Sequence, residues 1–335
     1  MERRNADPLL KVEDMVVEFP TRRGVLRALD GVSFHLDRGE VLGVVGESGA
    51  GKSVTGSAVI GLIDPPGRLA GGKVYLAGER IDDLDEGAMR RVRGKRIGMV
   101  FQDPLTSLNP LYTVGRQLTE TIETHTDLTP KEARARAIEL LHAVGIPAAE
   151  RRIDDYPHRF SGGMRQRVVI ALALCAEPSL VIADEPTTAL DVSIQAQIIA
   201  VLKRMCREQD AAIMLITHDM GVIAETADRV AVMYAGRIVE VGPVAELIRN
   251  PSHPYTQGLM ACIPQLGERR PRLAQIDGAM PRLTDKIDGC AFHPRCPQAM
   301  DRCRREAPPA FGQNGRETAC WLMADETRAR EAVDG

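Results

Sequence analysis

The fold of this 335-residue chain follows from the eight residues Gly46-Glu47-Ser48-Gly49-Ala50-Gly51-Lys52-Ser53. They follow the apolar run VLGVV, precede a helix-compatible segment and satisfy the pattern G-x-x-x-x-G-K-[ST]. Glycines let the backbone curl so that its N–H groups face phosphate oxygens, and the helix N-terminus adds positive potential. The stretch therefore predicts a nucleotide phosphate site formed by these residues, in which Lys52 reaches the β- and γ-phosphates and Ser53 ligates Mg²⁺.

A second stretch, Leu180-Val-Ile-Ala-Asp184-Glu185, predicts the hydrolytic half of the site. An apolar strand there delivers carboxylates to the edge of the sheet where open α/β folds bind ligands. Asp184 is suited to hold Mg²⁺, directly or through water, and Glu185 to polarise the attacking water as a general base. An acidic strand end that only caps a helix is the alternative. The presence of the phosphate-site pattern at residues 46–53 favours the hydrolytic role for Asp184 and Glu185.

Apolar runs elsewhere predict an α/β fold with a mostly parallel sheet. Residues 40–45, 180–183 and 212–217 read as short strands buried on both faces, with helical patterns between them. Residues 10–19 and 32–36 alternate apolar with polar side chains, which predicts an antiparallel β layer beside that sheet.

Two further regions complete the predicted organisation. Residues from about 103 to 176 lack strong strand patterns and include an amphipathic stretch that Gly145 would stop, so they form a helical subdomain inserted in a domain of residues 1–250. From about residue 250 the chain becomes rich in Pro, Arg and Cys, and residues 251–335 are predicted to form a C-terminal extension.

The composition favours a globular protein and argues against a nucleic-acid-binding or membrane-spanning one. The chain is 44% apolar and 27% charged, a mixture typical of globular proteins. A net charge of -3 gives no basic footprint, so no nucleic-acid partner is expected. The N-terminal residues show no secretory signal pattern, and no stretch of about 18 apolar residues could span a bilayer, which predicts a cytoplasmic location.

The segment Phe160-Ser161-Gly162-Gly163-Met164-Arg165-Gln166-Arg167 gives the family resemblance. It resembles the signature motif of the ABC ATPases, with Met at the fifth position where many members have Gln. The resemblance covers at least residues 10–250 and implies a P-loop NTPase core. It also implies that Ser161, Gly162, Gly163 and Gln166 contact the γ-phosphate held by a partner subunit, so that ATP lies between two chains. Physically, a Ser hydroxyl and Gly amides at a helix start form a second anion site.

Four more positions match the same family template. Gln102 matches the loop that contacts Mg²⁺ and the attacking water and communicates with the membrane subunits, and His218 matches the switch histidine at the γ-phosphate. Asp191 matches the loop that crosses to the other subunit, and Phe19 the aromatic that stacks on adenine. A surface or capping role for each polar residue, and a core role for Phe19, are the alternatives.

The stretches LGVVGESGAGKS, FQDPLTSLNPLYTVG and PSHPYTQGLMACIPQL resemble the ATPases of oligopeptide and dipeptide importers, whose relatives also move nickel or glutathione. The resemblance implies a second ATPase subunit, two permeases, an extracytoplasmic binding protein, and a peripheral position at the cytoplasmic face of the membrane. A heterodimeric ATPase pair is expected, with a homodimer left open. The alternative is a soluble ABC-type ATPase in DNA repair or translation. Such proteins carry long coiled coils, two cassettes or a basic face, and none is seen in this sequence.

Four cysteines in the C-terminal extension form a separate candidate site. Five, six and sixteen residues separate Cys290, Cys296, Cys303 and Cys320, which matches neither the paired spacing of zinc sites nor the usual ferredoxin spacing. The residues alone are compatible with a metal cluster, with a zinc site or with four unrelated thiols. His293 could replace one cysteine as a ligand.

Resemblance to a branch of the peptide-importer ATPases with a [4Fe–4S] cluster on such a tail favours iron–sulfur. Nearby arginines would offset the charge of a thiolate cluster: Arg295, Arg302, Arg304 and Arg305. A tail that senses metal or redox state is a rival interpretation. Cys175, Cys206 and Cys262 are expected to be small buried hydrophobes.

Overall fold

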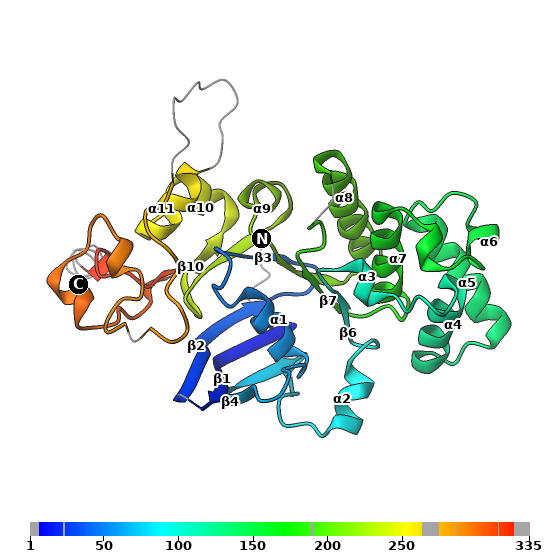
Figure 1. The fold of residues 1–335 in the computed structure, drawn as a ribbon, viewed down its shortest axis with the longest axis horizontal. Coiled ribbons are helices and arrows are strands. Elements are labelled where there is room, and N and C mark those ends of the chain that lie inside the picture. The colour runs from blue at the N-terminus through cyan, green and yellow to red at the C-terminus, as the bar shows by residue number, and fades with distance from the viewer. Residues whose placement is uncertain are drawn as a thin grey trace. The chain divides into compact units, whose positions relative to one another are not determined.

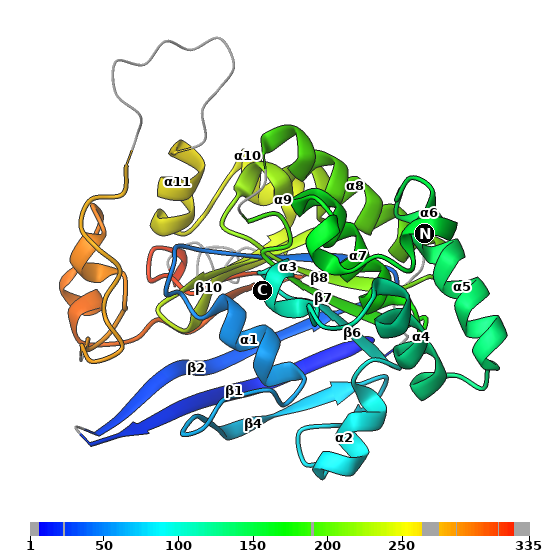
Figure 2. The same ribbon diagram turned by 45° about the vertical axis from the view of Figure 1, so that its right-hand side comes forward.

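The computed structural model describes residues 7–22, 24–188, 191–262, 275–285, 287–313 and 315–324. The chain divides into two compact units. The first unit comprises residues 1–10, 35–41 and 75–216, and the second unit comprises residues 11–34, 42–74 and 217–335. Figures 1 and 2 give two views of the ribbon with its elements labelled.

The elements have the following bounds. The strands are β1 Leu10–Thr21, β2 Gly24–Leu36, β3 Val41–Val45, β4 Arg68–Leu76, β5 Glu79–Arg80, β6 Ile97–Val100, β7 Leu180–Asp184, β8 Ala212–Ile216, β9 Arg229–Tyr234, β10 Arg237–Pro243, β11 Phe311–Gln313 and β12 Arg316–Thr318. The α-helices are α1 Lys52–Val59, α2 Glu86–Val92, α3 Pro104–Ser107, α4 Val114–His125, α5 Pro130–Ala143, α6 Ala149–Arg152, α7 Gly162–Leu174, α8 Val192–Glu208, α9 Met220–Thr226, α10 Val244–Arg249 and α11 Pro254–Ala261. Short 3-10 turns are η1 Pro157–Arg159, η2 His293–Arg295 and η3 Asp301–Arg304.

The first unit contains the parallel strands β6, β7 and β8. Ile97 pairs with Leu180, and Leu180 pairs with Ala212, so the three strands end at one edge. Every residue of β7 and β8 is buried, as the continuous apolar runs predicted. This register places the residues that follow β6 and β7 side by side.

Helices make up residues 103–176 of the first unit. Helix α5 begins with a capping box, because the Thr129 hydroxyl accepts from the Glu132 N–H while the Glu132 carboxylate accepts from Thr129. It ends before Gly145, whose φ of 81° is the left-handed conformation that glycine adopts most easily. Helix α7 packs against β6, α4, α5 and α8, and Figure 2 shows α4, α5 and α6 grouped near it.

The second unit contains a mixed set of strands. Strand β3 pairs with β9 in parallel, β9 pairs with β10 antiparallel, and β12 continues that antiparallel order beyond β10. A further layer contains β1, β2 and β4, with β1 in the middle. Buried and exposed side chains alternate along the second half of β2, as the sequence pattern indicated.

A buried carboxylate joins the C-terminal part of the second unit to β10. Glu240 is fully buried and accepts hydrogen bonds from the N–H groups of Ser252 and His253, both at 2.9 Å. Arg316, the first residue of β12, lies 3.3 Å from the same carboxylate. Burial lowers the pKa of His253 to about 4, so this histidine is neutral in the folded chain. The contacts explain why residues 316–318 add to β10.

The α/β class predicted from the sequence is confirmed by the parallel pairing of β6, β7 and β8 and of β3 with β9, with helices between these strands in the chain. The boundary near residue 250 and the limits of the helical subdomain remain predictions. Among the residues described, none of the helices is both long and apolar enough to cross a membrane.

Candidate functional site

The phosphate loop, residues 46–53, connects β3 to α1 within the second unit. Gly46 has a φ of 154°, and a Cβ there would lie 2.3 Å from the carbonyl oxygen of Met233. Gly51 has a φ of 100°, and a Cβ there would lie 2.8 Å from Leu29. At Gly46 a side chain would collide with backbone, and at Gly51 the positive φ would strain any residue that has a side chain. The glycines of the sequence pattern are thus required by the local packing.

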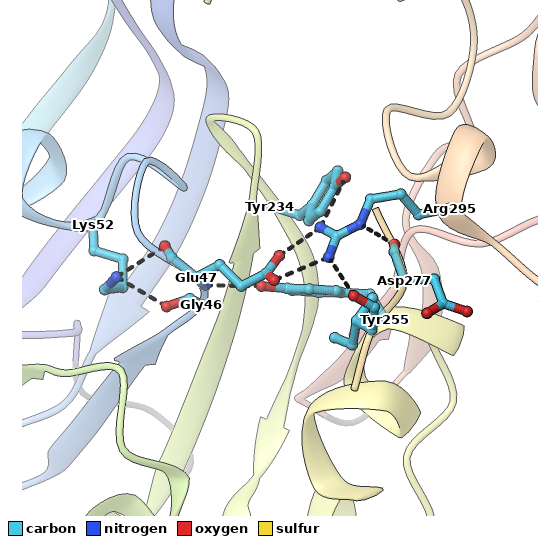
Figure 3. Close-up of polar contacts among 8 residues, drawn as sticks. Gly46, Glu47, Lys52, Tyr234, Tyr255, Asp277 and Arg295 are labelled. Atoms are coloured by element: carbon cyan, nitrogen blue, oxygen red, sulfur yellow. Dashed lines mark hydrogen bonds and ion pairs between the residues drawn. The ribbon is translucent and has the colours of Figure 1, made fainter. Parts of the chain in front are cut away.

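The Lys52 side chain folds back over the phosphate loop (Figure 3). Its ammonium group donates to the carbonyl oxygen of Gly46 at 2.9 Å and to that of Glu47 at 3.1 Å, and the residue is only 5% exposed. Ser48, Gly49 and Ser53 are exposed, whereas Ala50 is buried. The buried ammonium group of Lys52 is therefore held at the phosphate loop, while Ser48, Gly49 and Ser53 remain exposed.

The predicted hydrolytic residues of the first unit lie at the ends of β7 and β6. The Glu185 carboxylate accepts from the Gln102 amide at 3.2 Å and from the Thr188 hydroxyl at 2.9 Å. Its backbone has a φ of 44°, uncommon for a residue other than glycine, and its N–H donates to the carbonyl of Ile216 at 2.8 Å. Asp184, the last residue of β7, is 6% exposed. The structure thus brings the predicted residues Gln102 and Glu185 into direct contact.

The signature segment begins helix α7 in the first unit. Ser161 is the N-cap and accepts from the Met164 N–H at 3.4 Å. Ser161 and Gly162 are exposed and Gly163 is half-buried, so the helix start is accessible. Gln166, predicted to contact nucleotide, is only 1% exposed and lies one turn inside the helix. Gln166 is therefore less accessible than Ser161, Gly162 and Gly163 of the same segment.

The remaining predicted residues lie at element ends. Asp191 is exposed at the N-cap of α8, where its carbonyl accepts from the Ile194 N–H. His218 is exposed, and the preceding Thr217 donates its N–H to Val44 of β3 at 3.1 Å, two residues before the phosphate loop. Phe19 is half-buried on β1 with its ring packed against Gly67. His218 is thereby tied to the strand that carries the phosphate loop.

The four C-terminal cysteines line one cavity in the second unit, together with Phe292, His293 and Trp321. Cys303 and Cys320 are buried, and Cys290 and Cys296 are half-buried. Burial, together with a smaller effect of the three other thiols, raises the pKa of Cys320 to about 11. No group of three His, Cys, Asp or Glu side chains in the described ranges is arranged to hold a single metal ion.

Two of the three other cysteines are buried as predicted. Cys175 and Cys206 are 3% and 1% exposed, and burial raises the pKa of both to about 12. Cys262 is half-buried at the end of α11.

Arg295, predicted to offset charge at the cysteines, forms an ion pair with a residue of the phosphate loop. Its guanidinium group makes a two-pronged contact with the Glu47 carboxylate, at 2.6 Å and 3.0 Å (Figure 3). Arg302 pairs with Glu306 at 2.9 Å and stacks 3.4 Å from the centre of the Trp321 ring. Both guanidinium groups are therefore paired with carboxylates of the same unit, and their effect on the charge of a thiolate cluster stays a prediction.

Comparison with known proteins identifies the family. Residues 29–188 match the model described as ABC transporter, and residues 239–303 match the model described as oligopeptide/dipeptide transporter, C-terminal region. The chain is 52% identical over 307 residues to the oligopeptide transport ATP-binding protein OppD of Bacillus subtilis, covering 90% of this chain and 85% of the relative. It is 46% identical over 319 residues to the dipeptide transport ATP-binding protein DppD of Escherichia coli, covering 95% of this chain and 98% of the relative.

Solved structures agree with the sequence matches. The dimeric ATP-binding cassette MJ0796, in a post-hydrolysis state bound to ADP and Pi, aligns with a TM-score of 0.63 at 28% identity, covering 70% of this chain and 98% of that chain. Fold and site together define an ABC-type ATPase that couples ATP hydrolysis to transport. The chain belongs to the family of ATP-binding subunits of oligopeptide and dipeptide ABC transporters.

Proposed function

We propose that this chain powers the import of di- or oligopeptides by binding and hydrolysing ATP in a dimer of ATPase subunits at two permeases. Nickel and glutathione are the related cargoes proposed from the family resemblance. The observation that carries the hydrolytic role is the contact between Gln102 and Glu185 at the edge of the first unit's sheet. It holds a candidate base beside an amide that can orient water.

The roles of the nucleotide-binding residues follow from their chemistry. The phosphate loop supplies backbone N–H groups, and Lys52 supplies a cation to the β- and γ-phosphates. Ser53, Gln102 and Asp184 supply the oxygen ligands that Mg²⁺ prefers. His218 contacts the γ-phosphate, and Phe19 offers a ring to adenine.

The dimer is proposed from the accessible start of α7. Ser161 and Gly162 are exposed there, and a helix N-terminus with an exposed serine suits a phosphate brought by another subunit. The proposed interface also includes Gly163, Gln166 and Asp191. Because Gln166 is buried, it would support the helix start from within and not contact the nucleotide directly. ATP bound by both subunits would favour the closed dimer, because a ligand shifts an equilibrium toward the state that binds it better.

Permease contact is proposed for the segment after Gln102. Leu105 and Leu111, six positions apart in the chain, are large apolar side chains that are 63% and 78% exposed, and exposed apolar surface favours a protein contact. The complete transporter would contain a companion ATPase, two permeases and an extracytoplasmic binding protein, with this chain peripheral at the cytoplasmic face. A heteromeric ATPase pair is the proposed arrangement.

Replacing the exposed serine tests the dimer. We expect Ser161→Arg to abolish ATP-driven association with the companion ATPase, measured by size-exclusion chromatography with light scattering, because the larger cation fills the phosphate position. Thr124→Arg, a substitution of an exposed residue on α4 of the same unit, is the matched control for added bulk and charge. Association that persists in Ser161→Arg would refute a shared nucleotide at this helix start.

We propose an iron–sulfur cluster for the cysteine cavity from the chemistry of its four thiols. The thiols of Cys290, Cys296, Cys303 and Cys320 line one apolar cavity, and four thiolates are the ligands that such clusters use. A bound [4Fe–4S] cluster would join separate parts of the C-terminal segment through iron–thiolate bonds. Zinc on the same thiols is the second candidate, since four thiolates also suit that ion.

Metal analysis of a cysteine variant tests this assignment. Cys303→Ser should lose most of its iron and lower the melting temperature by roughly 5–10 °C, because metal binding contributes directly to folding. Iron content, sulfide content and thermal unfolding of anaerobically purified protein are the measurements. Cys262→Ser, outside the cavity, should retain both properties. Zinc in place of iron would contradict the cluster, and a metal-free, equally stable wild type would contradict any metal.

A further inference from the structure

Arg295 lies far from the phosphate loop in sequence but is in direct contact with it. Its side chain is 5% exposed and pairs with Glu47, 248 positions earlier in the chain. We propose that Arg295 is a positioning residue for the phosphate loop, so that ATP affinity depends on the folded cysteine segment. The inference rests on the proposed nucleotide function and adds a residue to its site.

The guanidinium group of Arg295 is fixed on several sides. Besides the two bonds to the Glu47 carboxylate, its Nε donates to the carbonyl of Asp277 at 2.9 Å and one terminal nitrogen donates to the carbonyl of Ile276 at 3.2 Å (Figure 3). Bidentate pairs between arginine and a carboxylate are both stronger and more directional than single ion pairs. The Glu47 side chain is consequently held in one place.

The backbone of the same loop residue is held by the C-terminal segment as well. The Glu47 N–H donates to the hydroxyl of Tyr255 at 2.9 Å. The Tyr255 ring is fully buried and packs edge-on against Tyr234 at 4.7 Å and beside Phe292 at 5.3 Å. Phe292 also lines the cysteine cavity. Side chain and backbone of Glu47 are thus fastened to the part of the second unit that carries the thiols.

The negative charge of Glu47 affects how strongly the phosphate loop binds ATP. Glu47 places a carboxylate on the loop proposed to receive a triphosphate, and like charges repel more strongly where they are partly shielded from water. Arg295 neutralises that carboxylate. Without the arginine, the carboxylate would be partly buried and unpaired, and both its repulsion and its mobility would weaken ATP binding.

The cysteine segment sets the position of Arg295. The Arg295 N–H donates to the carbonyl of Phe292 at 3.0 Å, and the His293 N–H donates to that of Cys290 at 3.0 Å. Cys296 follows Arg295 directly. Because coupling between two sites is reciprocal, a change at the thiols that moves this turn also changes ATP affinity, and bound ATP stabilises the turn.

Direct binding of ATP to the full-length protein tests the inference. Magnesium-free ATP, which prevents hydrolysis, is titrated against wild type, Arg295→Gln and Arg295→Lys. We expect about tenfold weaker affinity for Arg295→Gln and a smaller loss for Arg295→Lys, because lysine keeps the charge but not the paired geometry. Arg304→Gln, an exposed arginine of the same segment, is the matched control and should bind like wild type.

A double variant separates positioning from general damage. If Arg295 acts through Glu47, adding Glu47→Gln to Arg295→Gln should recover part of the lost affinity, because no unpaired carboxylate remains. Circular dichroism and metal content are measured on every variant. Wild-type affinity in Arg295→Gln, or losses that simply add in the double variant, would overturn the inference. Failure of the wild type itself to bind ATP would instead refute the nucleotide function.

Discussion

Glu185→Gln should leave ATP binding intact while reducing ATP hydrolysis about 10²- to 10⁴-fold, the usual contribution of a general base. The substitution keeps the size of the side chain and an oxygen to accept from Gln102 and Thr188, whose bonds to Glu185 are 3.2 Å and 2.9 Å long. It removes only the basic group. Steady-state phosphate release, measured beside equilibrium ATP binding, separates the two effects.

The control for this substitution is Glu123→Gln. Glu123 is an exposed glutamate on α4 of the same unit, and its loss should change neither binding nor turnover. Turnover at the wild-type rate in Glu185→Gln would remove Glu185 from the role of base and leave its contact with Gln102 as structural.

Lys52→Ala should weaken ATP binding by about 10- to 100-fold. Hydrogen bonds to charged groups contribute about 1.5–3 kcal/mol each, and a factor of ten in affinity corresponds to about 1.4 kcal/mol. The ammonium group also holds the carbonyls of Gly46 and Glu47, so its removal loosens the start of the phosphate loop. Binding of a fluorescent ATP analogue is the measurement.

Lys73→Ala serves as the comparison for the lysine. Lys73 is exposed on β4 of the same unit, and we expect its replacement to leave ATP affinity at the wild-type value. Equal affinities of Lys52→Ala and Lys73→Ala would mean that the loop of residues 46–53 does not bind phosphate.

Local sequence patterns predicted the parts of the fold in which neighbouring residues determine structure. The buried run before Gly46, the apolar strand ending at Asp184 and the helix stop at Gly145 all appear in the structure close to the predicted positions. In each case the signal is carried by residues adjacent in the chain, such as a continuous apolar run or a glycine with positive φ. Those signals were sufficient to define the class of fold.

Strands that depend on a distant partner escaped prediction. Residues 316–318 are Arg-Glu-Thr, without an apolar pattern, yet they pair with β10 because Arg316 reaches the buried carboxylate of Glu240. Strand formation depends strongly on such context. The pair of Arg295 and Glu47 was missed for the same reason, since 248 positions separate the two residues and the cysteines nearby suggested another role for the arginine.

Peptide uptake by proteoliposomes tests the central claim most directly. The vesicles contain the two permeases, the companion ATPase and this chain, with the binding protein and labelled peptide outside and ATP inside. The account predicts ATP-dependent uptake with the wild-type chain and at least tenfold less with Glu185→Gln, the variant that retains ATP binding. Equal uptake by the two chains, or uptake without ATP, would contradict the conclusion that hydrolysis at this site drives transport.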